Sequence, residues 1–252
     1  MRESKFYPMK TFVAGIFLLV CTVGIYSFKS HPGSKPDAVI NNSISKTKAT
    51  AINYRYIKGL QEKLSLTGTK LSEEILSLAL MGFNKLNAQQ QLSKDSILTI
   101  IDYTMSSKEK RLFVIDLKSQ VLMFKSVVAH GRNTGDEYAK AFSNQLNSHQ
   151  SSLGFYITQK PYTGSNGYSL ALEGVDDGFN DKAKQRAIVM HGAEYASEQM
   201  IKIKGYLGRS FGCPSLPPQM NKKIIETIKD GNCLFAYYPD QKYLKTSKFL
   251  NG

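Results

Sequence analysis

The sequence is poor in the residues that bind metals and form disulfides. Only three cysteines and four histidines occur among its 252 residues. It has no C-x-x-C or H-x-x-x-H spacing, and such spacings supply the ligands of common zinc sites. We therefore expect neither a metal nor another cofactor. A disulfide framework is not needed either, because a chain of this length can bury a sufficient core.

A run of basic residues interleaved with aromatic ones, which is typical of nucleic-acid binding, is also missing. The net charge is nevertheless +13. Such a charge suits anionic polymers of a cell envelope or lipid headgroups. We therefore expect no nucleic acid among the partners.

One apolar segment, residues 11–28, is uncharged and follows Arg2, Lys5 and Lys10. Its length lies between that of a signal-peptide core and that of a membrane-spanning helix. No small-x-small cleavage site follows it, so residues 1–29 are expected to be an uncleaved anchor rather than a cleaved signal peptide. The preceding basic residues place the N-terminus in the cytoplasm and the rest outside, in the periplasm or at the outer face of the membrane.

Three further regions follow. Residues 30–51 are rich in Ser, Thr, Asn, Lys and Pro and are predicted to be a polar linker. Residues 52–95 form a helical segment, with helices at 54–66 and 72–87, that is expected to pack on the following domain. Ser72 before Glu73 is the helix-capping pattern that begins the second helix.

Residues 96–252 contain short strand-like runs separated by turn residues, which predicts one mainly-β domain. Strands are expected at 96–103, 111–117, 121–128, 154–158, 169–173, 187–190 and 233–238. A short helix is expected at 221–229, closed by Gly231.

The segment 208–217 reads GRSFGCPSLP and places Cys213 among turn-forming and polar residues. A structural core cysteine normally has aliphatic neighbours, so we expect Cys213 on an exposed bend. Gly212 lets the backbone approach a ligand, and the Cys213 N–H can then face a developing oxyanion. These features predict a nucleophilic cysteine. A disulfide with Cys233 is the main alternative, although apolar neighbours favour a buried free thiol at Cys233.

A cysteine nucleophile needs a base, and His191 is the first candidate because it follows the strand-like run 187–190. His130 precedes a glycine after a similar run and is its rival. His31 and His149 lie in polar stretches and are weaker candidates.

The pair His191-Gly192, followed by residues 210–213 (SFGC), resembles the signature of the L,D-transpeptidase (YkuD-like) catalytic domain. It is most similar to the branch of these murein enzymes with the motifs G-R-S-x-G-C-P and H-G-A-x-Y. Further similar segments are 129–135, 142–144, 151–156 and 186–190, within a region from about Leu76 to about Leu250. Phe211 replaces the family's second histidine, and Pro214-Ser215 replaces the pair that carries its usual arginine.

The resemblance implies a β-sandwich with the cysteine on a groove edge, and it assigns roles. Cys213 is the nucleophile and His191 the base, oriented by a main-chain carbonyl near Gly192. Gly212 contributes to an oxyanion site, and Ser210 braces the loop or binds substrate. Arg209 is the nearest replacement for the missing arginine as a carboxylate clamp, and Tyr195 and His130 line the groove.

The implied activity is acyl transfer on peptidoglycan stem peptides through a thioester, so that the enzyme forms cross-links in the bacterial cell wall. Carbapenem-type inhibitors are expected to acylate the same thiol. Two alternatives stay open: an L,D-carboxypeptidase with water as acceptor, and a non-catalytic wall-binding domain.

Overall fold

The computed structural model describes residues 54–251. The expected anchor (1–29) and linker (30–51) lie outside the described residues. Within the described part of the chain, no helix is long and apolar enough to cross a membrane.

The first elements are helical, as predicted. A helix covers residues 54–65, and α2 (Glu73–Ala88) follows it. Ser72 caps α2, because its Oγ accepts a hydrogen bond from the Ile75 N–H at 3.2 Å. Glu73 and Glu74 occupy the first turn, where the helix dipole favours negative charge. Both helices bury apolar side chains in the same core as the sheet.

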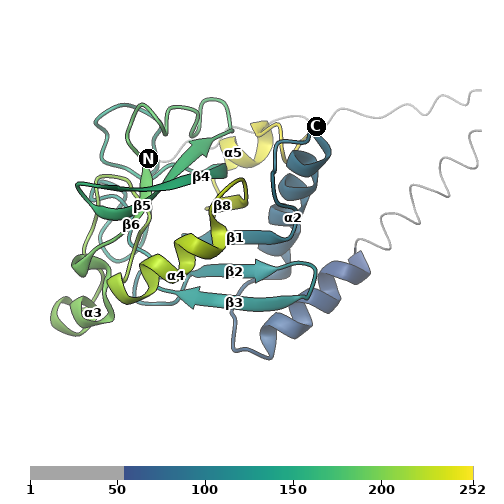
Figure 1. Ribbon diagram of the computed structural model, residues 1–252, viewed down its shortest axis with the longest axis horizontal. Helices are drawn as coiled ribbons and strands as arrows, with labels where there is room; N and C mark the ends of the chain where they lie inside the picture. The colour runs from purple at the N-terminus through teal and green to yellow at the C-terminus, as the bar shows by residue number, and fades with distance from the viewer. Residues whose placement is uncertain (1–53, 252) are drawn as a thin grey trace, which may run out of the picture. The chain divides into compact units, whose positions relative to one another are not determined.

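Eight strands form one mixed sheet in the order β3-β2-β1-β8-β4-β5-β6-β7. Figure 1 labels these strands from β3 to β6. Parallel pairs join β1 to β8 and β6 to β7, and the other neighbours are antiparallel. The strands are β1 (Ile97–Asp102), β2 (Leu112–Asp116), β3 (Val121–Ser126), β4 (Gly154–Gly164), β5 (Gly167–Gly174), β6 (Val189–Gly192), β7 (Ser215–Leu216) and β8 (Cys233–Tyr237).

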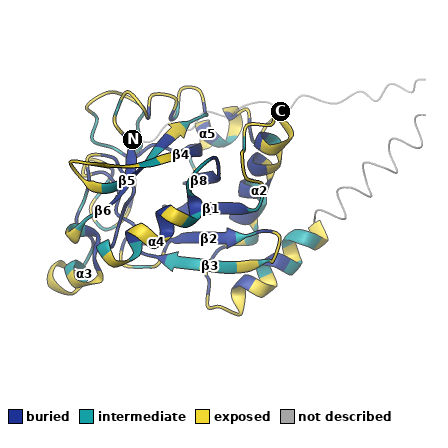
Figure 2. Ribbon diagram, viewed as in Figure 1, coloured by how far each residue is buried: buried dark blue, intermediate teal, exposed yellow. Residues whose placement is uncertain are grey.

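The mainly-β class is therefore confirmed. All eight strands are hydrogen-bonded in one sheet, so the two layers of the expected sandwich have to arise by bending of this sheet. One irregularity lies in the ladder between β4 and β5, whose register shifts between Thr158 and Pro161. Pro161 has no N–H to donate, and a bulge at such a position kinks the strand. Residues from both ends of the sheet share one apolar core, and β1, β2 and β8 are buried along almost their whole length (Figure 2).

The helices after the sheet's first strands are η1 (Glu194–Ala196), α3 (Glu198–Lys204), α4 (Pro218–Ile228) and α5 (Gln241–Thr246). Only α4 was predicted; α3 and α5 are too short to show a clear apolar period. α4 contacts β6, and β7 lies directly before α4. The segment from β6 to α4 thus brings His191 and Cys213 to the same end of the sheet.

Candidate active site

The loop that carries Cys213 lies between α3 and β7 and is fixed by Ser210. The Ser210 hydroxyl donates to the Cys213 carbonyl at 2.7 Å and accepts from the Gly212 N–H at 3.0 Å. Gly212 has φ +125°, in the region that favours glycine. A Cβ added there would lie 2.7 Å from the Gln150 carbonyl oxygen, so a side chain has no room.

The Cys213 side chain is buried, with 9% of the residue exposed, which corrects the expected exposed position. Its Sγ accepts a hydrogen bond from the Val189 N–H at 3.5 Å and donates toward the Ala187 carbonyl at 3.7 Å. Turn-forming neighbours do mark a bend here, but the bend folds inward against the start of β6. The loop forms the predicted bend, but the thiol that it carries is buried.

His191 lies on β6 and is held through both ring nitrogens. Its Nδ1 is 3.1 Å from the Gly192 carbonyl oxygen, which can only accept, so Nδ1 carries the proton. Its Nε2 is then an acceptor, 3.1 Å from the Ser215 hydroxyl. The Tyr195 hydroxyl is 2.9 Å from that of Ser215. A hydrogen-bond chain therefore runs from Tyr195 through Ser215 to a neutral imidazole.

Cys213 and His191 lie on adjoining segments, and no hydrogen bond joins them. The β6–β7 pairing sets His191 opposite Ser215, two residues after Cys213, and Sγ contacts the N–H of Val189, two residues before His191. Among residues 54–251, however, Sγ bonds only to Val189 and Ala187. Ser215 holds the imidazole nitrogen that a base would use.

The pKa shifts of the two groups agree with a neutral resting pair. Burial raises the pKa of the Cys213 thiol, and the Val189 N–H and the charge of Arg186 only partly offset this. Burial lowers the pKa of His191, against the opposing effect of its hydrogen bond to Gly192. The thiol thus keeps its proton and the imidazole stays free to accept one.

The Cys213 N–H is the best-placed oxyanion donor. The Gly212 N–H, also expected in this role, already donates to Ser210. Within the described residues the Cys213 N–H makes no hydrogen bond. Losing one such donor typically costs about 3 kcal/mol of transition-state stabilisation.

The Arg209 side chain is already paired with protein groups. Its Nη1 forms an ion pair with Asp136 and lies 3.4 Å from the carbonyls of Arg132 and Gly135. The guanidinium therefore braces the 132–136 turn.

His130 is also occupied, and only 1% of the residue is exposed. The buried Arg111 donates to its Nδ1 at 2.7 Å, and its Nε2 is 3.1 Å from the Gly135 carbonyl. Burial and the Arg111 charge lower the pKa of His130 to about 4. This histidine has no nitrogen left for a thiol and does not line an open groove. Its role as a rival base is therefore not supported by the geometry.

The disulfide alternative is excluded, because Cys213 and Cys233 are both free and buried. Cys233 begins β8 and is completely enclosed, as its apolar neighbours predicted. Burial raises the pKa of its thiol far above neutrality. No group of three or more His, Cys, Asp or Glu residues suitable for a metal occurs between residues 54 and 251.

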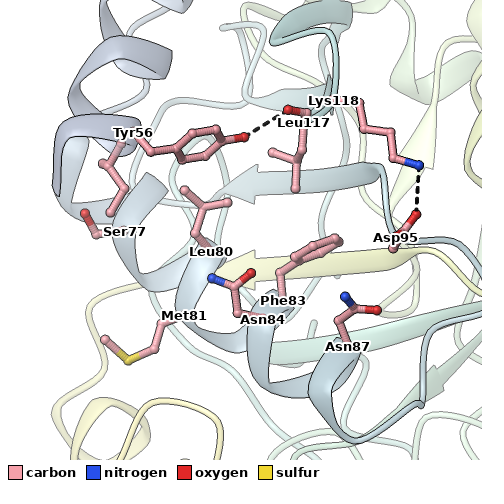
Figure 3. Close-up of a pocket in the computed structure, with 11 residues that line it drawn as sticks. Tyr56, Ser77, Leu80, Met81, Phe83, Asn84, Asn87, Asp95, Leu117 and Lys118 are labelled. Carbon is pink, nitrogen blue, oxygen red and sulfur yellow. Dashed lines mark hydrogen bonds and ion pairs between the residues drawn. The ribbon is translucent and has the colours of Figure 1, made fainter. Parts of the chain in front are cut away.

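A cavity of about 730 Å³ lies away from these residues, between helix 54–65, α2 and the β2–β3 turn (Figure 3). Three of its polar side chains are already paired: the Tyr56 hydroxyl donates to the Leu117 carbonyl at 2.9 Å, and Lys118 lies 3.3 Å from Asp95. It contains no nucleophile beside a base, so it is not the candidate active site.

Comparison with known proteins identifies the fold family. The family described as the L,D-transpeptidase catalytic domain matches residues 67–237, from before α2 to the end of β8. This chain belongs to the L,D-transpeptidase catalytic domain family.

Solved structures with detectable similarity to this L,D-transpeptidase domain are distant. An L,D-transpeptidase from Mycobacterium smegmatis is 10% identical, with a TM-score of 0.36 over 57% of this chain and 59% of that one. An L,D-transpeptidase from Stackebrandtia nassauensis is 16% identical, with a TM-score of 0.34 over 72% and 76% of the two chains. LD transpeptidase LdtMt1, solved in complex with imipenem, is 11% identical, with a TM-score of 0.34 over 56% and 59%.

The chain thus spans about three-fifths of the length of the Mycobacterium smegmatis protein. A comparison with curated proteins finds no significant match.

Two residues of this candidate site could not be assigned from the sequence. Ser215 was noted only as a departure from the family pattern, yet it is completely buried and bonds to His191. Arg186 lies inside a segment of family resemblance, and its positive charge lowers the pKa of the Cys213 thiol. Neither contact could be found by sequence spacing, because both depend on how the 186–191 segment lies against the loop.

Replacing Ser215 with alanine is expected to lower kcat roughly tenfold with little change in KM, because losing the hydrogen bond that orients the imidazole outweighs the gain from freeing Nε2. Tyr195→Phe is the matched comparison, since it removes only the outer hydroxyl of the chain and should have a smaller effect. Steady-state kinetics of the two variants test this. A Ser215→Ala enzyme with wild-type kcat would show that the imidazole needs no such support.

Proposed function

We propose that the chain is a cysteine-dependent L,D-transpeptidase of peptidoglycan, with Cys213 as nucleophile and His191 as base. Membership of the family supports the reaction class. The observation that carries the residue assignment is the Nδ1–Gly192 hydrogen bond, which leaves the Nε2 lone pair of His191 directed toward the strand that follows Cys213. A neutral imidazole in this tautomer is the form that accepts a thiol proton.

In the first half-reaction the Cys213 S–H bond breaks and its proton passes to Nε2 of His191. The sulfur attacks the carbonyl carbon between the L-centre of the stem's diamino acid and the terminal D-Ala. The resulting oxyanion receives a hydrogen bond from the Cys213 N–H. As the carbon–nitrogen bond breaks, His191 returns the proton to the departing D-Ala amine, and a thioester remains.

In the second half-reaction the side-chain amine of another stem attacks the thioester. His191 takes the proton of that amine, and the sulfur leaves as a thiolate that recovers it. An amide cross-link forms and the enzyme is restored, so no external oxidant, reductant or cofactor is consumed.

A small rearrangement has to precede the first step. In the resting arrangement the thiol points to the Ala187 carbonyl and the Ser215 hydroxyl occupies Nε2. Proton transfer therefore requires the S–H to turn from Ala187 toward the imidazole while Ser215 releases Nε2. Side-chain rotations of this kind take nanoseconds or less in exposed residues and longer in packed ones.

The proposal is tested by incubating the full chain with tetrapeptide stems, with and without an amine acceptor, and analysing the products by mass spectrometry. A cross-linked product that needs the acceptor supports the transpeptidase. A tripeptide alone, formed equally in both reactions, supports the L,D-carboxypeptidase, in which water attacks the thioester. Absence of both products would leave a wall-binding domain and contradict the enzyme.

The same thiol is expected to react with carbapenems, which acylate a nucleophile through their β-lactam carbonyl. Imipenem is the drug bound to LdtMt1 in its solved complex. A stable mass adduct on the Cys213 peptide after treatment with imipenem would support the assignment. An adduct that persists in Cys213→Ser would assign the reactive group elsewhere.

We place the active domain outside the cytoplasm, tethered by residues 11–28, because basic residues precede this apolar segment and its substrate lies in the envelope. External protease is expected to digest the domain in spheroplasts that express the full chain. A cytoplasmic protein of similar size serves as the control and should survive. Protection of both proteins until the cells are lysed would contradict the proposed location.

A further inference from the structure

Arg186 lies against the nucleophile loop although it is distant from it in sequence. It directly precedes the Ala187–Val189 segment that holds the Cys213 sulfur. A Cβ added at Gly212 would lie 3.4 Å from Nη2 of Arg186, which places the guanidinium beside the residue that precedes the thiol. Ala187 itself has φ +52°, a left-handed conformation that costs a non-glycine residue free energy. This strained turn points the Ala187 carbonyl at the sulfur.

The guanidinium also fixes the segment 143–152 next to Gly212. Nη1 donates to the Ser143 carbonyl at 2.7 Å and to the Ser152 hydroxyl, and Nη2 donates to the Gln150 carbonyl at 2.6 Å and to the Ser148 hydroxyl at 3.0 Å. The Gln150 carbonyl is the same group that a Cβ on Gly212 would meet. Arg186 therefore links one wall of the site to the cysteine loop.

All four acceptors of Arg186 are neutral oxygens. Among the ion pairs formed by residues 54–251, none includes Arg186. A half-buried guanidinium without a carboxylate partner is costly to desolvate, and it attracts whatever negative charge forms nearby. The thiolate of Cys213 is such a charge.

The effect on the thiol is specific to this arginine. Arg186 lowers the pKa of Cys213, and it is the one charged side chain that contributes to this shift. Arg209 instead lowers the pKa of His130 and forms an ion pair with Asp136. The two arginines therefore act on different groups.

We propose that Arg186, rather than Arg209, is the positioning residue of the nucleophile. It holds the 143–152 segment beside Gly212. Its positive charge stabilises the negative charge on the Cys213 sulfur after the thiol proton passes to His191. This inference rests on Cys213 being the nucleophile. It gives the chain a substitute for the arginine that its cysteine motif lacks, supplied from the turn that leads into β6, the strand that carries the base.

The test is the pH dependence of Cys213 alkylation by iodoacetamide, a small neutral probe, in the full chain without substrate. Arg186→Gln removes the charge and keeps an amide that can donate hydrogen bonds. Its alkylation midpoint should rise by about one pH unit, with roughly tenfold slower alkylation at pH 7. Arg186→Lys keeps the charge, so its midpoint should stay within about half a unit of the wild type.

Lys184→Gln is the matched control, because it removes an exposed positive charge two residues away and should leave the midpoint unchanged. Cys213→Ser measures the background from other thiols; Cys233 is completely buried and should contribute little. A purely structural role for Arg186 gives the opposite sign. Loosening of the 143–152 segment would expose the sulfur and accelerate its alkylation in Arg186→Gln.

Faster alkylation in Arg186→Gln, or an unchanged midpoint, would overturn the proposal. So would a rise of the midpoint in Arg209→Gln with none in Arg186→Gln. If Arg186→Gln does not fold, the test rests on Arg186→Lys. A rise of its alkylation midpoint by a full pH unit, with the positive charge retained, would contradict a role for that charge. The measurement uses no stem peptide, so its outcome is independent of whether the chain turns over stems.

Discussion

Cys213→Ser is expected to lose at least about 10³-fold of the turnover of tetrapeptide stems. A serine hydroxyl is a far weaker nucleophile than a thiolate, and enzymes that lose their nucleophile usually fall by this factor or more. The substitution is nearly isosteric, and the buried site should accept it with little change in stability. Product formation measured by mass spectrometry, with thermal unfolding as the check on folding, gives the result.

Cys233→Ser is the matched control for this substitution. It removes the other free thiol of the described residues, which lies on β8 and is completely buried. Its hydroxyl would be less well accommodated among apolar neighbours, so some stability should be lost, but folded enzyme should keep its turnover. Equal loss of turnover per folded molecule in both variants would contradict the assignment of Cys213.

His191→Ala is expected to lower turnover by about 10² to 10⁴-fold at neutral pH, the usual contribution of a general base. Its pH profile should also change shape. In the wild type the imidazole must be neutral to accept the thiol proton, and burial lowers its pKa. Activity should therefore persist to below about pH 6.5, the ordinary pKa of histidine, and fall only as the pH drops through the lowered value.

The variant should lose this acid limb, because no imidazole is left to be protonated. Its residual activity should rise with pH as Cys213 ionises unaided, and burial places that ionisation above the ordinary pKa of a thiol. His130→Gln is the comparison, since His130 was the rival base and is bonded to Arg111. A pH profile of His191→Ala that parallels the wild type would remove His191 from the proton transfer.

Periodic elements of the fold could be predicted from the sequence. The Ser72 cap of α2, the hairpin of β2 and β3 and the buried β8 all follow from local patterns that the structure retains. β4 runs six residues past the expected end, to Gly164, because its outer part is an exposed arm that shows no apolar alternation. β7 has two residues, and a pairing so short depends on tertiary contacts rather than on local propensity.

The site could be predicted only as far as adjacent residues specify it. The Cys213 bend follows from Gly212 and Pro214, and the Gly192 carbonyl lies one residue from the imidazole it orients. The burial of the thiol could not be foreseen, because it depends on the turn at Ala187 folding over the loop. Closeness in sequence to Cys213 favours Arg209 as the arginine of the site, whereas the structure pairs Arg209 with Asp136 and brings Arg186 beside Gly212.

The most direct test of the account is the intact mass of the wild-type chain, quenched during turnover of a tetrapeptide stem and then mapped by proteolysis. We expect a mass gain equal to the stem without its terminal D-Ala, carried by the peptide that contains Cys213. Cross-linked or hydrolysed product without any such adduct would contradict a thioester intermediate. An adduct confined to another peptide would contradict Cys213 as its site.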